Sequence, residues 1–176
     1  MRLLRHLFAI MLLPFLVTIV VPAFIVFPLK TRGIGWGPPA PLGLVSALIG
    51  GVLIGAGLLL IYRTVSLFAT EGDGTLAPWD PPRRLVVRGP YRYVRNPMIS
   101  GVLAVLLGEA IFLGSVPLLA WFLAFFALNA VLMPLIEEPM LERRFGSDYV
   151  VYRQNVPRWI PRPRPWTTGQ RPQGRR

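Results

Sequence analysis

Long apolar runs are the feature that most constrains what this chain can fold into. A helix needs roughly 20 apolar residues to cross a bilayer. The sequence holds three runs that approach or exceed this length, at about 7–29, about 42–61 (reaching toward 68) and 98–136. The last is long enough for two helices, and Gly114-Ser115-Val116-Pro117 divides it, because glycine and proline mark a turn. We therefore expect helices at about 97–113 and 117–136, and an all-α integral membrane bundle of about four transmembrane helices.

The basic residues lie between and after these runs. With four spans and the N-terminus inside, seventeen arginine and lysine residues fall on the inner side and two on the outer side. This bias obeys the positive-inside rule, so both termini are expected in the cytoplasm. The excess of arginine over lysine is typical of a GC-rich bacterial genome, so the expected location is a bacterial cytoplasmic membrane. The net charge of +11 lies beside apolar runs rather than on a soluble patch, so the expected partner is the anionic membrane surface and not nucleic acid.

Composition excludes several kinds of site. The chain has no cysteine and one histidine, His6, so disulfides, thiol nucleophiles, histidine metal clusters and a Ser/His/Asp triad are excluded. A phosphate-cradling Gly-Lys-Ser/Thr loop is also missing from the sequence. No metal site is therefore expected. The sequence leaves the oligomeric state open.

The first polar segment that indicates a site precedes the third predicted helix. Asn96 and Pro97 form an N-cap and first-turn pair that opens this helix. The free N–H groups of a helix N-terminus attract anions, and Arg95 lies beside them, which suits a carboxylate or a phosphate. Gly101, one turn further on, would let a ligand approach the backbone. The alternative is that these residues only start a membrane helix.

The second polar segment is the pair Glu137-Glu138, directly after the fourth apolar run. A helix C-terminus disfavours negative charge, so two carboxylates at the expected end of that helix require a cationic partner. Arginines from the loop before the third helix can supply it. A cationic ligand is the alternative.

A juxtamembrane helical segment is expected after the glutamates. Gly146 should end one short helix, and Ser147 should begin another that ends at Pro157. Beyond about Pro161 the chain is rich in Pro, Arg and Gln without an apolar period, so it is expected to be disordered or to lie against headgroups. We therefore expect a single membrane-embedded domain over 1–165 and a disordered basic tail over 166–176.

Together, a helix N-terminus with an arginine and a carboxylate pair can face each other across one cytoplasmic pocket. Such a pocket suits a zwitterionic, amino-acid-like ligand whose carboxylate meets the helix end and whose ammonium meets Glu137 or Glu138. S-adenosylmethionine is a ligand of this kind, with an additional sulfonium cation. Methyl transfer asks the protein mainly for alignment and a dry pocket, so the scarcity of histidine and cysteine is no objection.

The same residues carry a resemblance to a known family. It rests on two motifs, Gly89-Pro90-Tyr91-…-Arg95-Asn96-Pro97-…-Gly101 and Glu137-Glu138-…-Leu141-…-Phe145-Gly146-…-Tyr149-…-Tyr152-…-Val156-Pro157-Arg158-…-Ile160-Pro161. Over residues 76–161 the chain resembles the isoprenylcysteine carboxyl methyltransferase and phospholipid methyltransferase superfamily. The resemblance implies a membrane-embedded enzyme that binds S-adenosylmethionine on the cytosolic side and takes a lipophilic acceptor from the bilayer. It also implies the cofactor-binding residues, which are Arg95, Asn96, Pro97, Gly101, Glu137 and Glu138.

Two positions depart from the family pattern. Arg-His-Pro is Arg95-Asn96-Pro97 here, and a frequent tyrosine two residues after the proline is Ile99. Asparagine keeps a hydrogen-bonding side chain but does not titrate near neutrality. A non-catalytic membrane protein whose motifs no longer bind cofactor therefore remains an alternative.

The chemistry at the acceptor is less constrained than the cofactor site. Tyr91 and Glu138 are the candidate catalytic residues, and a small lipid or isoprenoid is the expected acceptor. Membrane sterol reductases also resemble the C-terminal half, and they bind NADPH. That alternative is disfavoured, because an NADPH site adds basic contacts for phosphates and Glu137-Glu138 would repel those phosphates.

Overall fold

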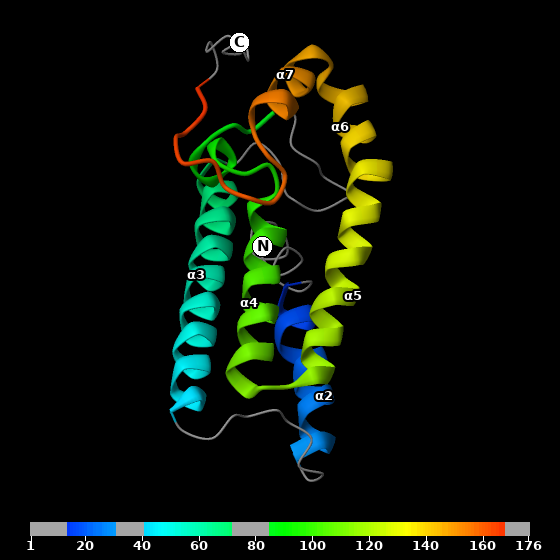
Figure 1. Cartoon of the computed structure of the whole chain (residues 1–176). Helices are drawn as coiled ribbons and strands as arrows, with labels where there is room; N and C mark the ends of the chain where they lie inside the picture. The colour runs from blue at the N-terminus through cyan, green and yellow to red at the C-terminus, as the bar shows by residue number, and fades with distance from the viewer. Residues whose placement is uncertain (1–13, 31–40, 72–84, 168–176) are drawn as a thin grey trace, which may run out of the picture.

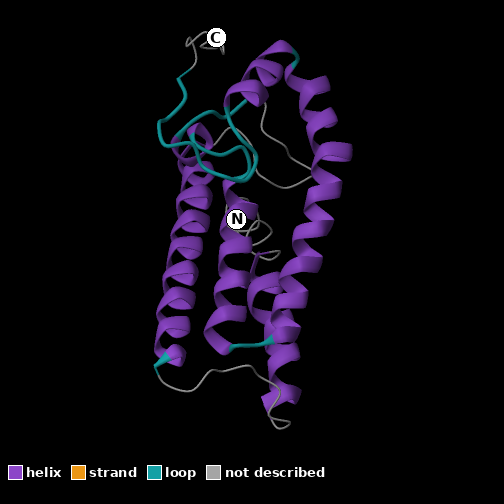
Figure 2. Cartoon of the chain, viewed as in Figure 1, coloured by secondary structure: helices purple, strands orange, loops and turns teal. Residues whose placement is uncertain are grey.

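The computed structural model describes residues 14–30, 41–71 and 85–167, and every regular element in these ranges is a helix (Figures 1 and 2). The long elements are η1 (Leu16–Val20) continued by α2 (Val21–Lys30), then α3 (Leu42–Glu71), α4 (Pro97–Leu113), and α5 (Val116–Leu132) continued by η3 (Met133–Glu137) and α6 (Glu138–Phe145). The short elements are η2 (Gly89–Arg92), before α4, and α7 (Ser147–Asn155), after α6. The prediction of an all-α fold is confirmed for these residues.

Local sequence signals set both ends of α4. The side chain of Asn96 caps its first turn by accepting a hydrogen bond from the N–H of Ile99. Gly114 ends it in the left-handed conformation, with φ 57°, which glycine adopts at little cost. Ser115 then caps α5 by accepting a hydrogen bond from the N–H of Leu118. The predicted range 97–113 is confirmed, and the chain turns back where Gly114 and Pro117 predicted it.

Glycines bring α3 and α4 into close antiparallel contact. A Cβ on Gly57 would lie 2.6 Å from the carbonyl oxygen of Gly101, and one on Gly50 would lie 2.7 Å from that of Gly108. Gly50 and Gly57 are about two helical turns apart on α3, as Gly101 and Gly108 are on α4, so the contacts repeat along one face of each helix. The helices approach at a distance that no other residue would allow, as small residues permit in membrane proteins. Gly50 and Gly57, both in the second apolar run, are therefore the residues of α3 that allow this close packing.

Two wide π-type turns precede prolines within otherwise continuous helices. The N–H groups of Val21 and Glu138 each bond to the carbonyl five residues earlier, and a proline follows each of them. A proline ring clashes with the carbonyl four residues before it, and widening the turn relieves this clash without ending the helix. The fourth helix therefore continues past the predicted end at 136 and reaches Phe145. Consequently, the glutamates lie within a helix, and the expectation that they oppose the dipole of a helix end is wrong.

Apolar side chains cover the outward faces of the bundle. Leu44 in α3 is 72% exposed and Leu135 in η3 is 69% exposed, which is typical of a surface solvated by lipid. Two helical stretches are long and apolar enough to cross a membrane, Leu42–Leu67 and Val116–Phe145, while Leu16–Phe27 and Pro97–Leu113 are shorter apolar helices. A bundle of four complete spans remains a prediction, and residues 7–13 of the first run lie outside the described residues.

One end of the bundle, hereafter the polar end, carries residues 85–96, α6, α7 and the segment that follows (Figure 1). Residues 156–167, hereafter the C-terminal strap, fold back over the loop before α4. Backbone hydrogen bonds join the two segments: Arg95 N to Pro157 O, Arg162 N to Tyr93 O, and Trp166 N to Arg92 O. Trp166 is 3% exposed and packs in a small apolar cluster with Tyr149, Tyr152 and Val156.

This packing corrects the expectation for the tail. The chain from Pro161 to Thr167 is ordered, because Trp166 is buried and the backbone bonds to the loop, so the expected disorder is not found over these residues. The alternative, that this segment lies against headgroups, stays a prediction. Residues 168–176 lie outside the described residues. The boundary between a domain over 1–165 and a tail over 166–176 therefore stays a prediction.

Candidate functional site

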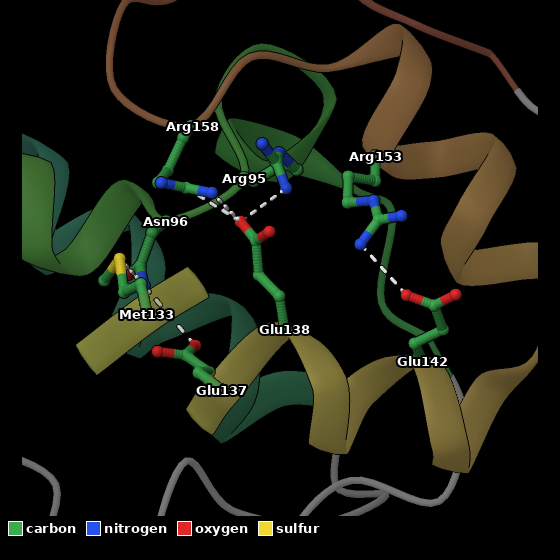
Figure 3. Close-up of polar contacts among 8 residues, drawn as sticks. All are labelled: Arg95, Asn96, Met133, Glu137, Glu138, Glu142, Arg153 and Arg158. Atoms are coloured by element: carbon green, nitrogen blue, oxygen red, sulfur yellow. Dashed lines mark hydrogen bonds and ion pairs between the residues drawn. The ribbon is translucent and has the colours of Figure 1, made fainter. Parts of the chain in front are cut away.

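Glu138 lies at the polar end, where it is held by two arginines from distant parts of the chain (Figure 3). Its Oε1 accepts hydrogen bonds from Nη1 of Arg95 and from Nε of Arg158, both at 2.7 Å. Nη2 of Arg158 is also 2.7 Å from the same oxygen. The Glu138 side chain is only 11% exposed, and a carboxylate in such surroundings requires cationic partners. The cationic partner that the sequence required is therefore present within the protein.

Glu137 extends in a different direction from Glu138 and meets Asn96 instead (Figure 3). The Asn96 side-chain nitrogen donates to Oε1 of Glu137 at 3.4 Å and to the sulfur of Met133 at 3.5 Å. The Asn96 oxygen remains on the first turn of α4, where it caps the helix. One asparagine side chain thus links the start of α4 to the π turn η3. Glu137, unlike its neighbour, has no ion pair among the described residues closer than 4.0 Å.

The C-terminal strap brings Arg158 to Glu138. Its backbone is fixed on either side, because Pro157 accepts from the N–H of Arg95 and the N–H of Arg162 donates to Tyr93. From α7, the hydroxyl of Tyr152 donates to the carbonyl of Tyr91 at 2.7 Å. The loop before α4 is therefore held from two directions, and both Arg95 and Arg158 reach one carboxylate.

Three tyrosines surround these charges, and burial governs their protonation. Burial raises the pKa of Tyr91, and the nearby Tyr152 and Glu137 raise it further. Burial also raises the pKa of Tyr152, although Arg95 opposes that effect. Burial and then Glu138 raise the pKa of Tyr149, while Arg95 lowers it. Burial therefore favours the neutral form of each phenol, in which the hydroxyl can donate a hydrogen bond. Tyr91 as a catalytic residue stays a prediction.

The structure brings together most of the residues that the sequence singled out. Arg95, Asn96, Glu137 and Glu138 form one connected set of contacts at the polar end. Pro97 is buried in the first turn of α4, directly after the cap. Gly101 is different: a Cβ there would lie 2.8 Å from Cγ1 of Ile61. Its open face is filled by α3, so the expectation that Gly101 leaves space for a ligand is wrong.

Arg158 is the main residue that the sequence argument missed. The motif that carries the family resemblance includes Val156-Pro157-Arg158, so a signal was available. A polar segment of this kind could not be placed next to Glu138, twenty residues earlier, without knowing that α7 and the strap fold back. Tyr149 and Met133 were missed as neighbours of the site for the same reason.

The charges of this set balance. Arg95 and Arg158 supply two cations, and Glu137 and Glu138 supply two anions. Nε of Arg95 is buried and has no hydrogen-bond partner within the described part of the chain, and such a group is costly unless something accepts from it. Among the described residues, no group of histidines and acidic residues could hold a metal ion. The arrangement suits a ligand that carries both a carboxylate and an ammonium group.

Comparison of the sequence with known protein families identifies the family to which this region belongs. The sequence model of the phospholipid methyltransferase family matches residues 45–148, which is more than half of the chain and includes every predicted site residue. No curated protein matches the sequence. The matched region contains the glycine contacts of α3 and α4, the Asn96 cap and both glutamates. The chain therefore belongs to the phospholipid methyltransferase family of integral membrane methyltransferases.

Proposed function

We propose that this protein is an S-adenosylmethionine-dependent methyltransferase that acts on a lipophilic acceptor, a lipid or an isoprenoid, at the cytoplasmic face of the membrane. The observation that carries the proposal is the meeting of two segments far apart in sequence. Arg95 contacts Glu138 at 2.7 Å and Asn96 contacts Glu137 at 3.4 Å. In this proposal the polar end faces the cytoplasm, which agrees with the positive-inside bias.

The charged set fits the amino-acid part of the cofactor. Nε of Arg95, for which the described residues offer no acceptor, would donate to its carboxylate. The N–H groups at the start of α4 lie next to Arg95 and add to the attraction for an anion. Glu137, whose one hydrogen bond within residues 14–30, 41–71 and 85–167 is a long one from Asn96 at 3.4 Å, would accept from its ammonium group.

The two glutamates therefore have different roles in this proposal. Glu138 is already neutralised by Arg95 and Arg158, so it orients these arginines and is not the ligand for the ammonium group. Glu137 remains available for a ligand. This division replaces the sequence-based nomination of Glu138 as a catalytic residue with a positioning role.

Bound S-adenosylmethionine would supply an electrophilic methyl group, and its transfer would leave S-adenosylhomocysteine. The residues of the chain then have to bind, orient and exclude water. Asn96 does not titrate, and burial favours the neutral form of Tyr91 by raising its pKa, so the proposal assigns proton removal to neither of them. An acceptor with an ionised carboxylate needs no base, whereas an amine would have to lose its proton to Glu137.

Ligand-induced stabilisation tests the cofactor assignment. A ligand at about 100 times its Kd stabilises the folded state by about 2.7 kcal/mol, which corresponds to roughly 5–11 °C in Tm for a chain of this size. Purified protein in detergent should therefore show such a shift with S-adenosylhomocysteine and none with NADPH. A shift with NADPH alone would support a reductase, and no shift with either would support a non-catalytic protein.

Variants test the roles of the glutamates. Glu137→Gln should remove most of the shift induced by S-adenosylhomocysteine, because an amide does not attract an ammonium group. Glu142→Gln is the matched control, since Glu142 lies about one turn further on and pairs with Arg153 at 2.9 Å, outside the proposed site (Figure 3). A full shift in Glu137→Gln would remove this residue from the proposed site.

The acceptor is identified by transfer itself. Membranes that contain the protein would be incubated with methyl-labelled S-adenosylmethionine, and the lipids extracted and separated. Label in an extractable lipid supports the proposal, and chemical analysis of that lipid reveals whether a carboxylate, an amine or a hydroxyl was methylated. Label found only in protein or in the aqueous phase would contradict a small lipophilic acceptor.

A further inference from the structure

A serine hydroxyl inside the bundle takes no part in the contacts described so far. Oγ of Ser100, in α4, is buried, and no described residue forms a hydrogen bond with it. Two threonines of the same bundle behave differently, because Thr18 and Thr64 each donate to the carbonyl four residues earlier, at 2.7 and 2.8 Å. A buried hydroxyl without a partner is costly, so Ser100 has a hydrogen bond to offer to a ligand.

The turn between α4 and α5 places Ser100 at the same depth as Asn129. Ser100 lies fourteen residues before Gly114, and Asn129 lies fourteen residues after Ser115. The two helices run in opposite directions from this turn (Figure 1). Each helical residue adds about 1.5 Å along the axis, so the two residues are equally far from the turn.

Neighbouring residues on each helix show that both side chains face the interface between α4 and α5. Asn96, one turn before Ser100, donates to the sulfur of Met133 at 3.5 Å. Asn129 lies one turn before Met133 and one turn after Phe125, which is buried in the core. Residues four apart share a helix face. Ser100 and Asn129 therefore face each other across the interface, one turn further from the polar end than the contact between Asn96 and Met133.

The pair offers hydrogen-bonding groups without charge. Nδ2 of Asn129 donates to the carbonyl of Phe125 at 2.8 Å, which leaves the side-chain oxygen of Asn129 as an acceptor. The hydroxyl of Ser100 can donate and accept, and it does not bond to Asn129 directly. Asn129 lies within the apolar stretch Val116–Phe145, where a charged group would be costly. The pair therefore suits an uncharged hydroxyl that accepts from Ser100 and donates to Asn129.

We infer that Ser100 and Asn129 bind a hydroxyl group of the lipophilic acceptor and hold the acceptor beside the methyl donor. This assignment rests on the proposed function, since it places the acceptor one helical turn, about 5.4 Å, below the level of Asn96 in the proposed cofactor site. Neither side chain titrates near neutrality, so the pair positions the acceptor and takes no proton from it. A water molecule between the two side chains would form the same hydrogen bonds, and the variants below distinguish it from an acceptor.

Steady-state methyl transfer by the full-length protein in mixed micelles tests this inference. The acceptor is the lipid extract of membranes that contain the protein, and labelled S-adenosylmethionine is the donor, with each varied in turn. Ser100→Ala should raise the apparent KM for the extracted lipids about two- to tenfold, as expected for the loss of one hydrogen bond. Its KM for S-adenosylmethionine and its Tm shift with S-adenosylhomocysteine should stay unchanged, because the cofactor site keeps all of its contacts.

A second variant, a control and an inhibitor locate the effect. Asn129→Leu removes the acceptor oxygen at similar size and should raise the KM for the lipids by a similar factor. Ser46→Ala is the matched control, because the hydroxyl of Ser46 donates to the carbonyl of Gly43 at 3.0 Å near the start of α3, and both KM values should stay unchanged. Hexadecanol should compete with the lipids, hexadecane at the same mole fraction should not, and Ser100→Ala should be less sensitive to hexadecanol.

Several outcomes would overturn the inference. An unchanged KM for the lipids in Ser100→Ala and Asn129→Leu would do so, and a lowered Tm in both variants would then indicate a bridging water. An equal rise in the KM for S-adenosylmethionine would place Ser100 in the cofactor site instead. Equal inhibition by hexadecanol and hexadecane would show that no hydroxyl is recognised. In each of these cases the unaltered protein still methylates lipid, whereas failure of the proposed function would abolish that transfer and the inference with it.

Discussion

The contact between α3 and α4 offers a sharp test of how this fold is held together. In Gly57→Ala, the new Cβ would lie 2.6 Å from the carbonyl oxygen of Gly101, 2.8 Å from Cγ2 of Val105 and 2.9 Å from the backbone nitrogen of Val105. Two of these three atoms belong to the main chain of α4, and they cannot move aside by rotating a side chain. The two helices would have to separate.

Gly51→Ala is the matched control for the size of this effect. Gly51 lies in the same helix, and a Cβ there would meet nothing within 4 Å. Both substitutions gain about 1 kcal/mol from the higher helix propensity of alanine, so this contribution cancels between them. The remaining difference is the cost of overpacking, typically about 1–3 kcal/mol, and we expect the upper end because the clash is with the backbone.

Thermal unfolding in one detergent measures the difference directly. A cost of about 3 kcal/mol corresponds to roughly 6–12 °C in Tm for a chain of this length, so Gly57→Ala should melt that far below Gly51→Ala. Gly101→Ala, which approaches the same contact from α4, should behave like Gly57→Ala. Melting of Gly57→Ala within about 2 °C of the control would refute the close helix contact, since about 2 °C corresponds to a cost of at most about 1 kcal/mol.

Three further predictions concern the polar end. Glu138→Ala leaves two mostly buried arginines uncompensated and should cost about 3 kcal/mol of stability. Glu142→Ala breaks a half-exposed pair and should cost under about 1 kcal/mol. Equal costs of the two variants in a melting assay would contradict the buried ion pair. Asn96→Ala removes the cap of α4 and should cost about 0.5–2 kcal/mol of stability, while Asn96→Asp should retain most of the stability that the cap provides. An unchanged Tm in Asn96→Ala would contradict the capping role of Asn96. Tyr152→Phe removes the hydrogen bond to the carbonyl of Tyr91 and should cost about 1 kcal/mol, with exposed Tyr93→Phe as the neutral comparison in the same assay.

Local sequence signals were sufficient for the helices and their ends. The run of apolar residues, the cap at Asn96 and the glycine at 114 act within a few residues of one another, and the predicted α4 matched the observed Pro97–Leu113. The helix end at Gly146 was also predicted from a local signal, the glycine itself. In the structure Gly146 lies between α6 and α7 and adopts a φ of 57°. The continuation of the fourth helix was not predicted, because its end was placed where the apolar run stops, whereas the π turn at Met133–Glu137 carries the helix on through the glutamates.

The partners of the charged groups were decided only by the tertiary structure. The sequence indicated that Glu137 and Glu138 need a cation, and that Arg95 and Asn96 suit an anion. It could not show that Arg95, forty-three residues before Glu138, and Arg158, twenty residues after it, share one carboxylate oxygen. Nor could it show that Gly101 faces Gly57 and not a ligand. The physical reason is that local backbone preferences act over a few residues, whereas a buried charge is compensated by whichever segments the packing of α3, α4, α7 and the C-terminal strap brings to it.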